Sequence, residues 1–210
     1  METSPPEQLF ALWDWRRRVT EVYADVRASS DPYVSWQLWR TARDELFGNH
    51  PQTPIDPSRR RSFSGLSYFE YDASLRMLIS LVPKAGERMK IDLARDGVIS
   101  LIAFGRTQGL AERFGGELSV YWIEGYGGGV FLPFKDATNS GETYGGGRYL
   151  LDTIKGSDLG RTNDGRTILD FNFAYHPSCS YSDLWVCPLA PAENVLPAAV
   201  RGGERHAKHD

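Results

Sequence analysis

The stretch Glu87-Arg88-Met89-Lys90-Ile91-Asp92-Leu93 decides the fold class, because apolar and charged residues alternate along it without a break. In an extended chain Met89, Ile91 and Leu93 share one face and the charged residues share the other. A helix would scatter the same residues around its circumference. The period of two therefore predicts a half-buried antiparallel strand.

Similar runs recur along the chain on both sides of this stretch. We expect further strands over residues 63–71, 75–82, 98–104, 117–124, 130–134, 148–154 and 167–175, separated by turn residues such as Asn163-Asp164-Gly165. About eight short strands without intervening helices predict an antiparallel β-barrel or a strongly twisted meander sheet, because an open sheet this wide would leave exposed edges.

The first part of the chain has a helical period instead. Ser4 and Glu7 form an S-x-x-E capping box, which predicts a helix over residues 5–28. Asp31-Pro32 begins a second predicted helix, over residues 32–47.

Tryptophans are concentrated on these two helices. We expect Trp13, Trp36 and Trp39 to pack the helices against the sheet, because large aromatic rings contribute most when they are buried.

The fold class predicted from these patterns is α+β, mainly β, in a single domain over residues 1–210. The parts we distinguish are a helical part (1–48), a connector (49–62), an antiparallel part (63–175), a proline-rich strap (176–201) and a polar tail (202–210). The prolines of the strap predict irregular structure.

Composition narrows the function classes. With 24 Lys and Arg against 27 Asp and Glu, the net charge of −3 gives no basic field for nucleic acid or an anionic membrane. No apolar run approaches the roughly 20 residues of a spanning helix or the core of a signal peptide. We expect a soluble cytoplasmic protein with neither nucleic acid nor membrane as a partner, and we leave self-association to a homo-oligomer open.

A glycine-rich loop precedes the most prominent candidate ligand residue. Tyr144 is followed by Gly145, Gly146 and Gly147 and then by Arg148. Converging backbone N–H groups and a guanidinium suit a carboxylate or phosphate. The alternative is a tight turn whose arginine pairs with a local carboxylate.

Residues 167–175 carry a second candidate site. Strict alternation places Leu169 and its apolar neighbours on one face and Asp170 with Asn172 on the other. Antiparallel pairing of residues 148–154 with 167–175 would bring Arg148 opposite residues 172–175. We therefore expect Arg148, Asp170, Tyr144 and Asn172 in one buried polar cluster, which is either a structural ion pair or the floor of a ligand site.

His176, Cys179 and Cys187 have the spacing His-x2-Cys-x7-Cys and are the only weak metal candidates that the motifs offer. A closed zinc site needs a fourth ligand, so we predict no metal and no cofactor. We expect the two cysteines to lie close together and to stay reduced in a cytoplasm.

The chain resembles a bacterial and archaeal family catalogued as domain of unknown function 1684. The resemblance is carried by Arg43–Phe47 with His50-Pro51, Tyr68-Phe69, the Asp136–Arg148 stretch, Leu169–Asn172 through Pro177 and Cys179, Cys187-Pro188-Leu189 with Pro191, Asn194 and Leu196, and Gly203-Glu204. Members usually have Asn where this chain has His176, which disfavours a catalytic or zinc role for that residue. The resemblance implies no reaction.

Three functions are compatible with these observations. The first is a barrel that binds a small, anionic organic ligand through the glycine-rich loop and Arg148. The second is an enzyme that uses Asp136, Tyr144 or Asp170 for proton transfer or hydrolysis, together with Arg148 and Asn172. The third is a structural or oligomerisation module with a buried polar network.

Overall fold

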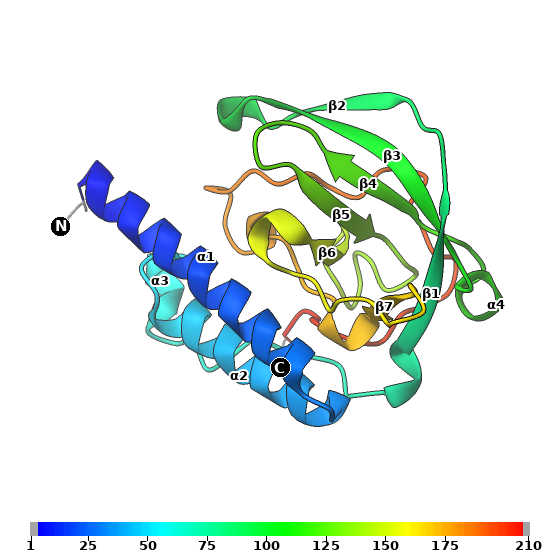
Figure 1. Ribbon diagram of the computed structural model, residues 1–210. Helices are drawn as coiled ribbons and strands as arrows, with labels where there is room; N and C mark the ends of the chain where they lie inside the picture. The colour runs from blue at the N-terminus through cyan, green and yellow to red at the C-terminus, as the bar shows by residue number, and fades with distance from the viewer. Residues whose placement is uncertain (1–3, 208–210) are drawn as a thin grey trace.

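The computed structural model describes residues 4–207 and consists of two long helices packed against a strongly bent antiparallel sheet (Figure 1). Helix α1 (Pro5–Ala28) and helix α2 (Pro32–Asn49) begin where the sequence predicts. The Ser4 backbone N–H donates to the Glu7 carboxylate at 2.7 Å, which completes the predicted capping box. The predicted positions of both helices are thus confirmed.

Among the described residues the sheet has seven strands, all paired antiparallel. They are β1 (Arg76–Pro83), β2 (Arg88–Asp92), β3 (Val98–Gln108), β4 (Ser119–Ile123), β5 (Gly129–Phe134), β6 (Arg148–Asp152) and β7 (Thr167–Asp170). Single turns of helix, α3 (Pro57–Arg60) and α4 (Ala111–Phe114), lie between longer elements. The predicted class, mainly β with two N-terminal helices on an antiparallel barrel-like sheet, is confirmed.

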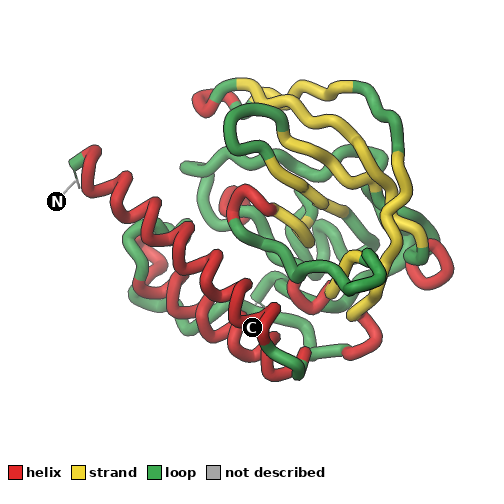
Figure 2. The backbone as a smooth tube through the Cα atoms, in the orientation of Figure 1, coloured by secondary structure: helices red, strands yellow, loops and turns green. Residues whose placement is uncertain are grey.

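Strand β3 organises the sheet. Strands β1 and β2 pair in succession along one of its edges, and β4, β5 and β6 follow as a meander on the other. Strand β7 pairs with the first half of β1, which gives the order β6-β5-β4-β3-β1-β7. Tyr149 of β6 forms an isolated antiparallel bridge with Tyr175, beyond the end of β7, and the barrel is nearly closed (Figure 2).

Two of the predicted strands differ from the structure. Residues 63–71 form no strand and join the C-terminal segment through an isolated bridge between Tyr68 and Glu204. Strand β7 ends at Asp170, whose carboxylate accepts the Asn172 backbone N–H at 3.0 Å and starts a 3-10 turn over Phe171–Phe173. The predicted alternation beyond Asp170 and the long pairing of residues 148–154 with 167–175 are therefore wrong.

Two of the three apolar clusters among the described residues are central to the fold. One fills the barrel and includes Leu118, Leu132 and Phe171. The other joins the helices to β7 and the residues after it, around Trp36 and Trp39, whose side chains are 3% and 0% exposed. Trp13 does not take the predicted packing role and is 67% exposed, because the first half of α1 extends past the sheet (Figure 1).

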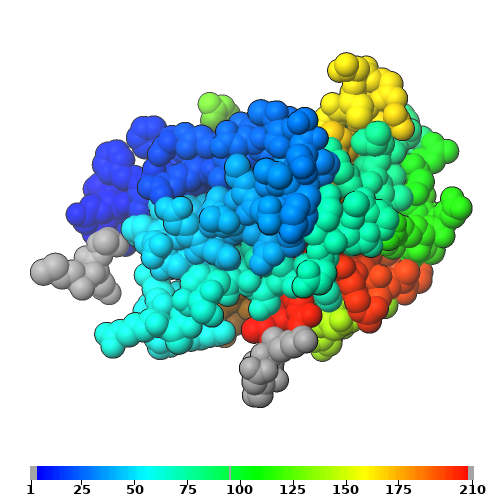
Figure 3. All heavy atoms as spheres, turned by 90° about the horizontal axis from the view of Figure 1, so that it is seen from below, coloured from blue at the N-terminus to red at the C-terminus, as the bar shows by residue number. Residues whose placement is uncertain are grey.

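The C-terminal segment is not the free polar tail that its composition suggests. Gly202, Gly203 and Glu204 are buried between the helical part and the sheet. Figure 3 shows this segment in red, emerging beside the connector in cyan. The strap is irregular, as predicted, with only a 3-10 turn over Ser178–Ser180. Residues 208–210 of the predicted tail lie outside the described residues.

None of the helices in residues 4–207 combines the length and the apolar character needed to cross a membrane.

Replacing Trp39 by Ala should lower the free energy of unfolding by about 3 to 5 kcal/mol, because it leaves a cavity between α2 and Phe173. The matched Trp13→Ala variant should change it by less than about 0.5 kcal/mol, since Trp13 lies in solvent. Urea unfolding followed by circular dichroism measures both. Equal losses in the two variants would contradict the packing described here.

Candidate functional site

Arg148 is completely buried at the start of β6. Its Nη2 atom lies 2.8 Å from the Asp136 carboxylate and also donates to the Val200 carbonyl at 2.7 Å. Nη1 donates to the carbonyl oxygens of Gly202 and Glu204. Burial lowers the pKa of the guanidinium and the Asp136 charge opposes that effect. The group joins the end of β5, the start of β6 and the C-terminal segment.

The glycines before Arg148 shape a turn. Gly147 has a φ of +97°, and a Cβ at this position would lie 2.6 Å from the Phe134 carbonyl oxygen. Its N–H donates to the Tyr144 carbonyl at 3.0 Å, which closes the turn. The geometry thus fits the alternative of a tight turn with an arginine paired to a local carboxylate.

Asp170 and Asn172 form a second, separate polar group. The Asn172 side-chain amide donates to Asp170 at 2.8 Å and to the Asp72 carbonyl at 2.8 Å. The cation that faces Asp170 is Arg76, opposite it in the β1–β7 pairing, with 3.7 Å between Nη1 and Oδ2. Burial raises the pKa of the Asp170 carboxyl. The ion pair expected between Arg148 and Asp170 is therefore replaced by two pairs, Arg148–Asp136 and Arg76–Asp170.

Tyr144 points toward the strap instead of either ion pair. Its hydroxyl lies 3.8 Å from the Cys179 sulfur, and its backbone N–H donates to Nε2 of His176 at 3.2 Å. Burial raises the pKa of the phenol to about 12, so the hydroxyl stays protonated at neutral pH. The predicted cluster of Arg148, Asp170, Tyr144 and Asn172 is thus distributed over three neighbourhoods.

The cysteines lie close together, as predicted. The Cys179 backbone N–H donates to the Cys187 sulfur at 3.4 Å, and both residues are free thiols. Contact with Cys179 lowers the pKa of Cys187, and the same contact raises that of Cys179. Within residues 4–207 the structure holds no group of three or more His, Cys, Asp or Glu side chains arranged to bind a metal ion. The absence of a cofactor stays a prediction.

A buried ion pair that the sequence did not predict lies beside this region. Arg43 of α2 contacts the carboxylate of Glu204 at 3.0 Å, and Glu204 also accepts the His176 backbone N–H and the Tyr181 hydroxyl. Glu204 is 1% exposed, and Arg43 together with these donors holds its pKa below the usual range in spite of burial. The only sequence signal was an acidic residue after two glycines in an apparently polar tail.

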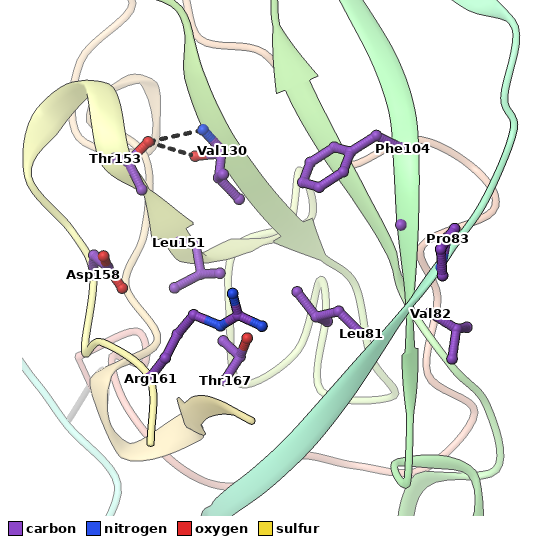
Figure 4. A pocket seen from close by; sticks show the side chains of 11 residues that line it. Leu81, Val82, Pro83, Phe104, Val130, Leu151, Thr153, Asp158, Arg161 and Thr167 are labelled. Atoms are coloured by element: carbon purple, nitrogen blue, oxygen red, sulfur yellow. Dashed lines mark hydrogen bonds between the residues drawn. The ribbon is translucent and has the colours of Figure 1, made fainter. Parts of the chain in front are cut away.

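An apolar cavity of about 360 Å³ opens at the mouth of the barrel, across the gap between β6 and β7 (Figure 4). Its lining residues are Leu81, Val82, Pro83, Phe104, Gly105, Val130, Leu151, Thr153, Asp158, Arg161 and Thr167. Leu151 belongs to the apolar cluster that fills the barrel, and Leu81 and Val130 pack against it. The cavity is thus the open end of the barrel interior.

Two polar side chains that line this cavity lack the usual partners among the described residues. The Arg161 guanidinium points into the space between Leu81 and Thr167 (Figure 4). It donates to the Gly165 carbonyl, and no carboxylate in the described part of the chain lies within ion-pair distance of it. Thr167 is 5% exposed, and its hydroxyl has no hydrogen-bond partner among residues 4–207. Sequence reasoning missed both, because Arg161 lies in a polar turn and is itself exposed, and only the folded structure places it at the rim of an apolar cavity.

Helix α1 holds the segment that carries Arg161. Arg27 donates to the Asp158 carbonyl at 2.6 Å. Gly156 approaches Thr20 so closely that a Cβ would lie 2.7 Å from its hydroxyl. The turn from residue 153 to β7 is therefore fixed from outside by the helix and from inside by the bridge between Arg161 and Thr167.

The model of a family described as "Protein of unknown function (DUF1684)" matches residues 61–205, more than half of the chain. The chain belongs to the DUF1684 family. No curated protein matches the chain. A similar solved structure is the solution NMR structure of an uncharacterized protein of Haloarcula marismortui, 30% identical, with a TM-score of 0.56. The alignment covers 84% of this chain and 96% of the archaeal one. For this DUF1684 chain the comparisons support a family and a fold and assign no reaction.

Arg148→Met should destabilise the protein by about 3 to 5 kcal/mol, because it leaves the Asp136 carboxylate buried without its cation. The double variant Arg148→Met/Asp136→Asn should recover part of that loss. Arg201→Met removes an exposed partner of Glu142 and should cost less than about 1 kcal/mol. Chemical denaturation measures all three, and a small effect of Arg148→Met would contradict the structural role.

The buried His176 makes stability depend on pH. Burial lowers its pKa from 6.5 to about 4, so between these values the unfolded chain binds a proton that the folded chain does not. The contribution of neutral His176 to the free energy of unfolding should be fully present above pH 6.5. The free energy of unfolding should then fall by roughly 3 kcal/mol as the pH drops toward 4.

The variant His176→Asn should lose this slope, because an Asn side chain has no titrating group. Acid destabilisation below about pH 4.5 should remain in both proteins, because Glu204 takes up a proton in the unfolded chain there, while Arg43 keeps its pKa lower in the folded protein. Melting temperatures measured over this pH range provide the comparison, and identical slopes for the two proteins would contradict the account of His176.

Proposed function

We propose that the protein binds a small amphipathic anion at the mouth of its barrel, with the apolar body of the ligand in the cavity and its acidic group on Arg161. The observation that carries the proposal is the Arg161 guanidinium, which faces an apolar cavity without a counter-ion among the described residues. A cavity of about 360 Å³ lies within the size range of pockets for small organic ligands.

The lining separates into two chemical halves. Leu81, Val82, Pro83 and Phe104, from β1 and β3, offer an apolar wall. Thr153, Asp158, Arg161 and Thr167, across the cavity, offer a hydroxyl-rich wall with one cation and one carboxylate. The Asp158 carboxylate already accepts the Gly160 backbone N–H at 2.8 Å. A ligand with an apolar body and one carboxylate matches this division best, because each half of the molecule meets its complement.

Arg148 does not contribute to this site. Four acceptors surround its guanidinium, and Arg148 is not among the residues that line the barrel-mouth cavity. In our proposal Arg161 and its turn bind the anion, in place of Arg148 and the glycine-rich loop. The class of ligand, a small organic anion, is unchanged.

The enzyme alternative has less support from the geometry. Asp136 and Asp170 are buried in separate ion pairs, and neither lines the barrel-mouth cavity. Proton transfer would need one of these carboxylates within hydrogen-bond reach of a bound substrate. A purely structural module accounts for the buried ion pairs but not for an apolar cavity at the barrel mouth that the Thr167 hydroxyl lines without a partner among the described residues.

Decanoate should bind wild-type protein more tightly than decanol, and Arg161→Met should remove the difference. Loss of a charge-assisted hydrogen bond corresponds to a weakening of about 10- to 100-fold for the acid. The alcohol should bind both proteins equally, because it meets the same apolar wall. Isothermal titration calorimetry measures the four affinities.

The control is Arg166→Met, on the same turn. Arg166 pairs with Asp164 and does not line the cavity, so its loss should leave decanoate affinity unchanged. Equal weakening in both arginine variants, or no preference of the wild type for the acid, would contradict the proposal.

Thr167→Val should leave the fold intact and weaken decanoate binding by roughly fivefold to thirtyfold, because it removes a buried donor at the polar wall. Unchanged affinity would mean that the acidic group lies elsewhere. Native mass spectrometry of the purified protein provides an independent check, since a retained acid adds a defined mass that should be missing from Arg161→Met.

A further inference from the structure

A second cavity lies on the other side of the helices from the barrel mouth. Its volume is about 310 Å³, and three segments meet around it: the connector, the strap after His176 and the C-terminal residues 205–207. Figure 3 shows the connector in cyan and the C-terminal segment in red bordering a hollow on this face. None of its lining residues is shared with the barrel-mouth cavity.

The charges around this cavity are of one sign. Arg59 and Arg205 line it together with His206, and its lining includes no Asp or Glu. The exposed Arg59 side chain makes no hydrogen bond or ion pair among the described residues, and its charge contributes to the lowered pKa of Asp56. In the same part of the chain, the Arg205 side chain makes only a 3.3 Å hydrogen bond to the His206 carbonyl and a contact with the Phe69 ring. Two arginines without an ion-pair partner among residues 4–207 thus line one cavity.

Two carboxylates lie next to the lining, and each already has a partner. Asp44 accepts the Leu66 backbone N–H at 2.8 Å, and Glu204 accepts the Tyr181 hydroxyl and pairs with Arg43 at 3.0 Å. The lining itself contains no carboxylate, so the charged groups that it offers to an anion are Arg59 and Arg205.

Uncharged donors complete the lining. The Ser180 hydroxyl oxygen is buried and has no hydrogen-bond partner among residues 4–207. His176 is 4% exposed, and its Nε2 accepts the Tyr144 backbone N–H, so in the neutral ring the proton is on Nδ1. Ile55, Phe63 and Leu66 form the apolar part.

We infer that this cavity is a second ligand site, specific for a phosphate monoester whose organic part is apolar or aromatic. A phosphoryl group carries close to two negative charges at neutral pH and offers three strong acceptor oxygens. That matches two guanidinium groups and a hydroxyl donor better than the single charge of a carboxylate does. Phe63 and Leu66 would contact the organic part. The inference is independent of the proposed barrel-mouth function, because the two cavities have no residue in common.

Phenyl phosphate is the probe that tests this site. We expect saturable binding to wild-type protein by isothermal titration calorimetry at neutral pH and low ionic strength. Arg59→Ala and Arg205→Ala should each weaken it several-fold, and the double variant by more than about tenfold, since each guanidinium–phosphate contact exceeds roughly 1 kcal/mol. Benzoate should bind more weakly than phenyl phosphate.

Arg61→Ala is the matched control, because Arg61 is an exposed arginine next to the same short helix and does not line the cavity. Its binding should equal that of the wild type. Thermal melts verify that all variants remain folded. No saturable binding of phenyl phosphate at millimolar concentration overturns the inference. So does an equal loss in the Arg61→Ala control, which would indicate a diffuse charge effect.

Discussion

The buried guanidinium of Arg148 is the constraint on which the rest of the architecture depends. It begins β6, pairs with Asp136 after the end of β5, and donates to three carbonyl oxygens of the C-terminal segment. A buried charge of this kind is tolerated when it is paired and hydrogen-bonded, and both terminal nitrogens of Arg148 are, while its Nε has no partner among the described residues. That requirement explains three features of the chain: the glycines before Arg148, the turn at Asp136 and the course of residues 200–204.

The same C-terminal segment connects the sheet to the helices. Glu204, whose backbone carbonyl accepts from Arg148, pairs through its side chain with Arg43 of α2 and accepts the His176 N–H from the strap. Two adjacent buried ion pairs thus hold helix, strap and sheet together through a few residues near the end of the chain. The family motifs around the Gly-Arg loop, the strap and Gly203-Glu204 lie together because they build this joint. The barrel mouth and the cavity at the connector are instead lined by arginines, Arg161 and Arg59 with Arg205, that form no ion pair among the described residues.

Most of the fold could be predicted from local sequence patterns. The wrong predictions concern which distant segments pair when the barrel closes. The capping box at Ser4, the Asp31 cap and the alternation in β2 are local, and the structure confirms each. The end of β7 at Asp170 was not predictable from alternation, because the Asp170 carboxylate turns the chain by accepting the Asn172 N–H. Which carboxylate pairs with Arg148 depends on strand order, and β6 pairs with β5 and not with β7. The position of Arg161 beside the cavity could not be predicted for a similar reason. It depends on the gap between β6 and β7, and the local sequence shows only a loop arginine.

The central claim is that the Tyr144–Arg148 loop is structural and that ligands enter at the barrel mouth. Backbone amide chemical-shift mapping of the intact protein, titrated with decanoate, tests it most directly. The account predicts that the largest shifts occur at residues 81–83, 104–105, 130 and 151–167, with residues 136–148 unaffected. Saturable shifts centred on the Tyr144–Arg148 loop and Asp170, with the barrel mouth silent, would contradict it.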